Sequence, residues 1–282
     1  MAQLNVNFMK TVAEFEAAMK KHMLLKTIFY KRLFGGRGME FDSFRSYGEG
    51  DDASLIDWKA TARARRPLVR QYVDERDVKI FVLIDSGDNM VFGSGNKIKL
   101  ERSAEIAACI THLIIGSGDS VGYAMYSDKI NFMKPMGGGK KQFYKLIEGL
   151  SDMSNYGNFS SLKNSLEFIA PRLKGVNAVF IISDFTNMDN ETLDTLKKFS
   201  RKYETIGVMV RDIVDERMPN IKNEIAIEDP RTGEQVVINP SVIKERYSEI
   251  NRGMKFKIRE SFRKSGITLF ENYTHENFIL PF

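Results

Sequence analysis

Stretches typical of buried strands alternate with stretches typical of helices through the middle of this chain, and no other feature limits its fold so strongly. Apolar runs predict strands at 79–84, 121–126, 176–183 and 205–210, with a shorter one at 130–133. Helical apolar spacing predicts helices at 97–117, 140–150, 162–173 and 191–202. Buried strands alternating with helices of this length specify a mostly parallel sheet with helices on both faces. The fold class is therefore α/β, doubly wound, and we expect the four longer strands to run parallel in one sheet.

The residues that precede this alternation follow other patterns. Apolar spacing from 12 to 33 predicts an amphipathic N-terminal helix that ends at Gly35 and Gly36. From 38 to 72, short aromatic and β-branched pieces separated by Gly, Asp and Pro predict an irregular β-rich extension packed on the sheet. We therefore divide the chain into a helical segment, 1–34, a β-rich segment, 35–78, and an α/β domain, 79–282.

The α/β domain is expected to carry an insertion at about 212–266, ahead of a final strand at 267–270. A turn at 229–233 lies between short strand-like runs, and a charged helix is predicted from 242 to about 264. These elements interrupt the alternation of buried strands and helices, so we place them outside the central sheet.

Cysteine content and apolar run lengths predict a cytoplasmic protein. Cys109 is the single cysteine, so no intramolecular disulfide can form, and its apolar surroundings predict a buried thiol in a reducing compartment. The longest apolar stretch, 106–115, is far shorter than the ~20 residues of a membrane-spanning helix. Charged residues interrupt any signal-peptide core near the N-terminus. The formal net charge of +5 is spread along the chain and argues only weakly for acidic partners.

Carboxylates follow two of the predicted buried strands. Asp85 and Asp184 end these strands, and Asp88 and the loop around Ser160 can reach the same edge of the sheet. At ~5 Å and an effective dielectric constant of about 20, two carboxylates repel each other by about 3 kcal/mol. A bound cation, a basic partner or a raised pKa of one carboxyl should reduce this repulsion. In the alternative interpretation, each acid only ends its strand and caps the next helix. The residues by themselves leave both interpretations open.

Two stretches resemble known signatures. The run from Asp85 to Asn89, DSGDN, stands where von Willebrand factor A domains carry the Asp-x-Ser-x-Ser metal-ion-dependent adhesion motif. More distinctive is the run 38–63, GMEFDSFRSYGEGDDASLIDWKATAR, which resembles the signature of the domain-of-unknown-function-58 family. The resemblance implies a von Willebrand factor A-like domain that is often encoded beside a MoxR-type AAA+ ATPase. It further implies a non-catalytic protein-interaction module, an adaptor or co-chaperone-like partner of that ATPase.

The resemblance also assigns positions of the metal motif. Asp85 matches its first aspartate, Ser160 falls where a loop threonine is expected, and Asp184 matches the aspartate after the later strand. The two motif serines are replaced by Gly87, which has no side-chain ligand, and by Asn89, which offers an amide oxygen. Mg²⁺ readily keeps water ligands. We therefore expect a weak, degenerate Mg²⁺ site made of Asp85, Asn89, Ser160 and Asp184.

A charged cluster within the family signature is the candidate docking surface for the ATPase or its protein client. Its members are Arg45, Asp52, Asp57 and Trp58. The same Arg and Asp residues can instead pair with one another and pin the β-rich segment to the sheet. Ser54 stands where the family usually has an arginine, so the role of that arginine is not carried over.

A Mg²⁺-dependent phosphoryl-transfer enzyme is one alternative, because such enzymes also use carboxylates at strand ends. The phosphatase motif needs an aspartate where this chain has Gly87, and the glycine-lysine loops at 93–97 and 137–140 lack phosphate-binding spacing. A nucleic-acid-binding protein is another alternative, because basic residues gather near Trp58: Lys59, Arg63, Arg65, Arg66 and Arg70. Acidic residues in and after this stretch reduce its positive charge, and nucleic-acid binding is therefore disfavoured. These acidic residues are Asp57, Asp74, Glu75 and Asp77.

Overall fold

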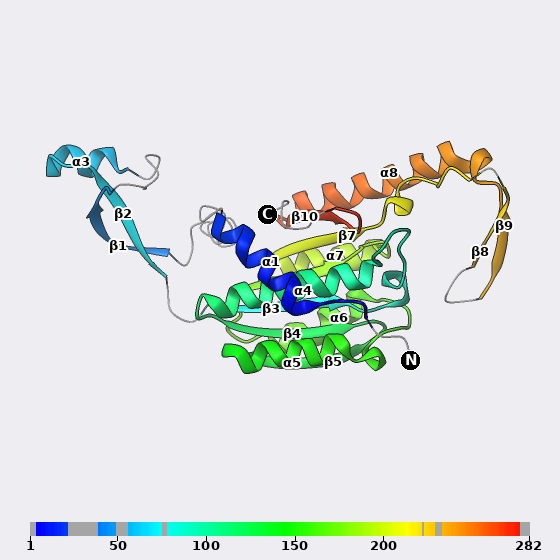
Figure 1. The fold of residues 1–282 in the computed structure, drawn as a ribbon, viewed down its shortest axis with the longest axis horizontal. Coiled ribbons are helices and arrows are strands. Elements are labelled where there is room, and N and C mark those ends of the chain that lie inside the picture. Colours follow the sequence, from blue (N-terminus) through cyan, green and yellow to red (C-terminus); the bar gives the residue numbers. More distant parts are fainter. Residues whose placement is uncertain are drawn as a thin grey trace.

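The computed structural model of the chain describes residues 4–21, 39–48, 56–74, 78–221, 223–228 and 233–276. At its centre lies a six-stranded sheet in the order β10-β7-β6-β3-β4-β5 (Figure 1). The strands are β3 (Lys79–Asp85), β4 (Ser120–Tyr126), β5 (Ile130–Gly137), β6 (Ala178–Ser183), β7 (Glu204–Arg211) and β10 (Thr268–Tyr273). Every neighbouring pair is parallel except β4 and β5, which form an antiparallel hairpin. The prediction that four strands run parallel in one sheet is confirmed.

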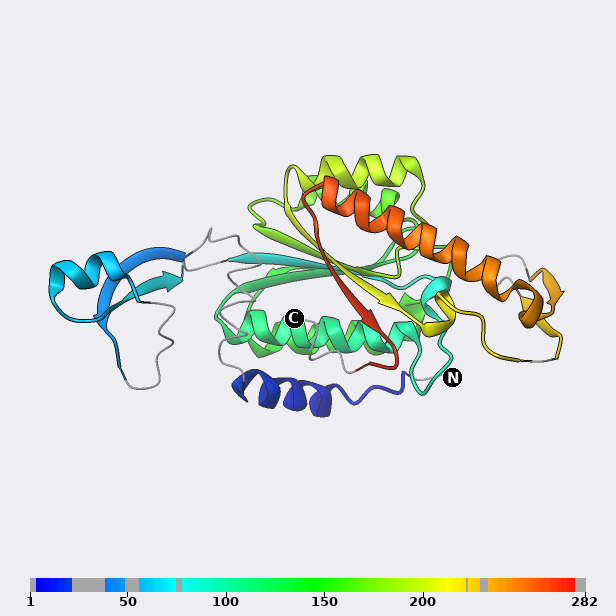
Figure 2. The same ribbon diagram turned by 90° about the horizontal axis from the view of Figure 1, so that it is seen from above.

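Helices cover both faces of the sheet, because alternate residues of a strand point to opposite faces. In β3, Ile80 and Val82 belong to one hydrophobic cluster, and Phe81 and Leu83 belong to another. The first cluster is closed by α1 (Phe8–Lys21), α4 (Lys99–Gly116) and α5 (Gly139–Ser151), and the second by α6 (Leu162–Ile169), α7 (Asn190–Ser200) and α8 (Pro240–Lys264). Figure 2 shows α1 and α4 on one side of the sheet and α7 and α8 on the other. The expected doubly wound α/β architecture is confirmed.

Helix α4 is buried along most of its length, because α1 covers part of the side that faces away from the sheet (Figure 2). Cys109 lies in α4 and is a buried free thiol, as predicted. Burial, with the charge of Glu105 as a second cause, raises the pKa of Cys109 far above its usual range, which disfavours the reactive thiolate. The helix predicted at 12–33 begins earlier, at Phe8, and residues 22–38 lie outside the described ranges.

The segment expected to be irregular, β-rich and packed on the sheet differs from that prediction. Its strands β1 (Met39–Ser46) and β2 (Leu68–Asp74) form an antiparallel pair, but a helix, α3 (Trp58–Ala64), lies between them. This helix forms because the Asp57 carboxylate accepts hydrogen bonds from the backbone N–H groups of Lys59 and Ala60, at 3.0 and 2.9 Å. We call β1, α3 and β2 the α3 unit. Figures 1 and 2 both show it beside the sheet body instead of over it.

The insertion carries α8 and a separate two-stranded hairpin, β8 (Ile225–Glu228) with β9 (Gln235–Ile238). The two short strands and the charged helix are thus present where the sequence predicts them, while residues 229–232 of the predicted turn lie outside the described ranges. Helix α8 is anchored near its C-terminal end by Ile258 and Phe262, and the Phe262 ring meets the Phe185 ring edge-on with centroids 4.9 Å apart. Within the described ranges, no helix combines the length and apolarity needed to cross a bilayer.

The anchoring of α8 predicts a large stability difference between two phenylalanines of the same helix. Phe262→Ala should lower the free energy of unfolding by about 3–5 kcal/mol, because a fully buried aromatic side chain is lost and a cavity opens. Phe256→Ala is the matched control. Phe256 is 67% exposed, so its loss should cost less than about 0.5 kcal/mol. Urea denaturation measures both values, and equal costs would mean that Phe262 does not anchor α8.

Candidate functional site

The carboxyl edge of the sheet brings the four predicted metal-site residues together. Asp85 ends β3 and Asp184 follows β6, and these strands are neighbours in the sheet. Asn89 Nδ2 donates to Asp85 Oδ2 at 3.3 Å and to Asp184 Oδ1 at 2.9 Å. Ser160 is buried, and its side chain hydrogen-bonds to Asp85. The residues meet because the carboxyl ends of neighbouring parallel strands lie at one edge.

Hydrogen-bond donors surround the Asp85 carboxylate. Ser183 Oγ donates to Asp85 Oδ2 at 2.7 Å, and the Gly87 backbone N–H donates to Asp85 Oδ1 at 3.0 Å. Burial raises the pKa of Asp85 to about 6, and the negative charge of Asp184 contributes to the same rise, while these hydrogen bonds and that of Ser160 oppose it. A raised pKa is one of the expected ways in which the repulsion between two close carboxylates is reduced.

The chain itself also supplies a cation beside these carboxylates, the ammonium group of Lys99. Lys99 Nζ lies 2.7 Å from Asp184 Oδ2 and 3.3 Å from Asp215 Oδ1, and the lysine side chain is 4% exposed. Burial acts to lower the pKa of Lys99, but the charges of Asp184 and Asp215 outweigh it and raise the pKa. Burial likewise acts to raise the pKa of Asp184, but Lys99 holds it below the usual range. The Lys99–Asp184 pair is therefore charged.

Sequence reasoning missed Lys99, although its position in the predicted helix carried a signal. Lys99 is the first residue of α4, where the helix dipole disfavours a cation. A lysine at the start of a buried helix therefore needs a carboxylate partner. Its partners lie 85 and 116 residues further along the chain, so no local spacing identifies them.

A cavity of about 570 Å³ lies over this carboxyl edge. Its lining includes the exposed apolar residues Val91 and Phe92, and the Phe92 ring centroid is 5.8 Å from Lys99 Nζ. The ionisable side chains of the lining are Asp88, Lys99, Asp184, Asp215 and Glu228. Among the described lining residues, carboxylates thus outnumber the ammonium of Lys99, so this part of the cavity is acidic with apolar residues beside it.

As arranged, these side chains do not fit a Mg²⁺ ion, which binds oxygen ligands in near-octahedral geometry. Asn89 turns its amide N–H groups toward both carboxylates, and the opposite amide orientation would point its oxygen at two negative groups. Gly87 offers no ligand, and a Cβ there would lie 2.6 Å from Asn89 Oδ1 and 2.7 Å from Ser160 Cβ. In the part of the chain that the structure describes, no three His, Cys, Asp or Glu side chains are grouped to hold a metal ion. The weak Mg²⁺ site stays a prediction.

The predicted docking residues lie on the α3 unit, apart from Asp52, which is outside the described residues. Trp58 is 69% exposed, so it does not serve as a buried pin against the sheet. Asp57 caps α3, and the exposed Arg45 donates to the Ser46 carbonyl oxygen at 3.4 Å. Exposure of Trp58 favours the docking interpretation over the purely structural one.

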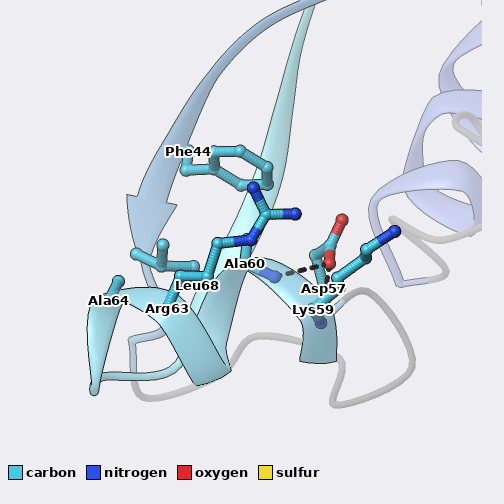
Figure 3. A pocket seen from close by; sticks show the side chains of 7 residues that line it. All are labelled: Phe44, Asp57, Lys59, Ala60, Arg63, Ala64 and Leu68. Atoms are coloured by element: carbon cyan, nitrogen blue, oxygen red, sulfur yellow. Dashed lines mark hydrogen bonds between the residues drawn. The ribbon is translucent and has the colours of Figure 1, made fainter.

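A cavity of about 470 Å³ lies on the α3 unit. Figure 3 shows the side chains that line it: Phe44, Asp57, Lys59, Ala60, Arg63, Ala64 and Leu68. Phe44 comes from β1 and Leu68 from β2, while the basic residues Lys59 and Arg63 come from α3. We call Phe44, Trp58, Lys59 and Arg63 the α3 surface. The sequence-based docking set contains only Trp58 of these four. Phe44 joins the surface because β1 pairs with β2, whereas Lys59 and Arg63 lie on the same helix as Trp58.

A family model described as protein of unknown function DUF58 matches residues 43–256 of the chain. The uncharacterized protein Rv1480 of Mycobacterium tuberculosis is 25% identical over 203 residues, which cover 71% of this chain and 63% of that protein. The uncharacterized protein YeaD of Bacillus subtilis is 25% identical over 109 residues, which cover 39% of this chain and 25% of that protein. The chain therefore spans less than two thirds of the length of these curated relatives.

Solved structures give more distant likenesses. A mutated aerotolerance-related membrane protein from Bacteroides fragilis matches with a TM-score of 0.45 and 14% identity, covering 72% of this chain and 92% of that one. BatB from Bacteroides thetaiotaomicron matches with a TM-score of 0.40 and 14% identity, covering 67% and 98%. A von Willebrand factor type A protein from Catenulispora acidiphila matches with a TM-score of 0.31 and 7% identity, covering 65% and 44%. The architecture described above rests on the strand order of the chain itself.

The buried ion pair predicts a large loss of stability when its acid is removed. Asp184→Ala leaves the Lys99 ammonium buried with Asp215 as its remaining partner, so the free energy of unfolding should fall by about 3–5 kcal/mol. Glu191→Ala is the control, because the Lys163–Glu191 pair is exposed and should contribute less than about 1 kcal/mol. Guanidinium denaturation near neutral pH compares the two variants. Similar small losses would contradict a charged, buried pair.

The raised pKa of Asp85 predicts stability that falls as the pH rises from about 4 to about 7. The carboxyl has a pKa of about 6 in the folded protein against an ordinary value of 3.8, so this stabilisation is complete below the ordinary pKa and is lost as the pH rises through 6. Relative to Asp85→Asn, which does not titrate, the parent protein should lose on the order of 2–3 kcal/mol of unfolding free energy. Urea denaturation of both proteins across this range measures the difference. Parallel pH profiles would show that Asp85 keeps an ordinary pKa.

Proposed function

The chain belongs to the DUF58 family of proteins of unknown function, and from that premise we propose that it is a non-catalytic protein-interaction module that acts as an adaptor or co-chaperone-like partner of a MoxR-type AAA+ ATPase. The observation that carries the proposal is the 69% exposure of Trp58, on a helix in which no residue is buried. The α3 surface is the docking site for the ATPase or its protein client.

The composition of the α3 surface is typical of a protein interface. Trp58 and Phe44 are large apolar side chains, 69% and 42% exposed, and tryptophan and arginine are the residues most enriched among those that dominate binding energy. Lys59 and Arg63 lie on the same helix, and both are exposed. This surface is therefore suited to a partner that offers acidic side chains around an apolar recess.

The arrangement at the carboxyl edge supports a role without catalysis. Asp85 and Asp184, the carboxylates that a phosphoryl-transfer enzyme would use, accept hydrogen bonds from Ser183, Asn89 and Lys99. Gly87 stands where the phosphatase motif needs an aspartate. Both features favour a protein-binding module over the enzyme alternative.

A binding experiment tests the α3 surface. Trp58→Ala should weaken binding to the MoxR-type ATPase of the source organism about 10- to 100-fold, because loss of a central aromatic contact commonly costs about 1.4–3 kcal/mol. Tyr144→Ala is the matched control, since Tyr144 is 57% exposed on α5, away from the α3 unit. Titration calorimetry measures the dissociation constants. Both variants should keep the parent unfolding midpoint, because neither side chain belongs to the core.

Two results would overturn the assignment. Equal affinity of the parent and Trp58→Ala would remove the α3 surface as the docking site. Absence of ATPase binding, together with a steep salt dependence of binding to a DNA or RNA duplex that Arg63→Ala reduces, would replace the proposal with the nucleic-acid alternative.

A further inference from the structure

We infer that the Lys99 ammonium takes the place of a divalent cation at the carboxyl edge, so that this edge keeps its shape without a metal ion. The inference goes beyond the proposed function and does not depend on it. It concerns which cation neutralises the carboxylates at the edge, whatever protein binds the α3 surface.

The contacts of Lys99 are those of a built-in cation. Its Nζ is 2.7 Å from Asp184 Oδ2 and 3.3 Å from Asp215 Oδ1, and its side chain is 4% exposed. Asp215 is itself held in place, because its Oδ2 accepts a hydrogen bond from the Asp212 backbone N–H at 2.8 Å. Asp184 follows β6 and Asp215 lies just beyond β7, so carboxylates from two neighbouring strand ends hold one ammonium.

The residues around the carboxylates are donors where a metal ion would need acceptors. Asn89 donates through Nδ2 to Asp85 and Asp184, while its buried Oδ1 accepts no hydrogen bond from the described residues. Gly87 leaves no room for a side chain, since a Cβ there would lie 2.6 Å from Asn89 Oδ1. A serine hydroxyl at position 87 therefore cannot be added as a ligand without moving Asn89.

Electrostatics explains why the ammonium excludes a second cation. A divalent ion bound to Asp184 would lie close to Lys99 Nζ and would be repelled by it, because interactions between charges are strong in a site of low dielectric constant. The ion would also have to displace the Asn89 amide from both carboxylates. Removing the positive charge at position 99 should therefore turn a metal-free edge into one that binds a divalent ion.

A metal titration of charge-deleted variants tests this inference. Lys99→Met keeps a side chain of similar length without charge, and Lys99→Gln keeps a neutral hydrogen-bond donor on a shorter side chain. Thermal unfolding of each protein is followed across millimolar Mg²⁺, Mn²⁺ and Ca²⁺, with calorimetry to count the bound ions. The parent protein should show no change in midpoint. Both variants should start with a lower midpoint and recover a few degrees as the ion binds.

Lys97→Met is the matched control, because Lys97 precedes the same helix but pairs with Glu105 instead of the carboxylates at the strand ends. Its midpoint should not respond to metal. If Lys99→Met fails to fold, Lys99→Gln decides the outcome. A metal-dependent midpoint in the parent protein, with one bound ion, would overturn the inference and support the weak Mg²⁺ site instead. A folded Lys99→Gln variant whose unfolding midpoint does not change with any of the three ions would also overturn the inference, since deleting the charge would then not create a cation site.

Discussion

The buried ion pair between Lys99 and Asp184 determines how the helix layer meets the sheet at its functional edge. Buried charge is tolerated only beside a partner, so the first residue of α4 must lie where β6 ends. A second buried acid fixes the loop that leads into α4: Asp212 accepts hydrogen bonds from the Ser94 backbone N–H at 3.0 Å and from Thr274 Oγ1 at 2.6 Å. The carboxyl edge is thus defined by directional polar contacts, whereas the two faces of the sheet are defined by apolar packing.

The central fold could be predicted from the sequence because its signal is local and repeated. The run from Ile80 to Ile84 is apolar at every position, and such a run describes a strand covered on both faces. Helix α3 could not be predicted in the same way. It has seven residues, too few to show a helical apolar period, and it depends on the cap at Asp57. Its exposure also means that no buried face was available to reveal it.

The candidate site was predictable in part for the same reason. Parallel strands bring their carboxyl ends to one edge, which is why Asp85, Asp184 and the loop around Ser160 could be placed together in advance. Asn89 was added by the resemblance to the metal motif. The argument that repelling carboxylates need a cation or a raised pKa also holds, since Lys99 supplies the cation and the pKa of Asp85 is raised. The family resemblance led to Mg²⁺ as the cation. Lys99 was missed because its contacts join residues that are far apart in the chain, and because a charged residue at a helix start is usually interpreted as exposed.

The attachment of the α3 unit has a mechanical consequence. Along the chain, β2 is followed after four residues by β3, which lies between β4 and β6 in the middle of the sheet. Seven residue pairs join β3 to β4 and five join it to β6, all in parallel register. A pulling force applied to the α3 unit along the axis of β3 would therefore load these hydrogen bonds in shear, all at the same time, instead of opening them one after another. Tension on the projecting unit would thus be borne by a strand that is hydrogen-bonded to a neighbour on both sides.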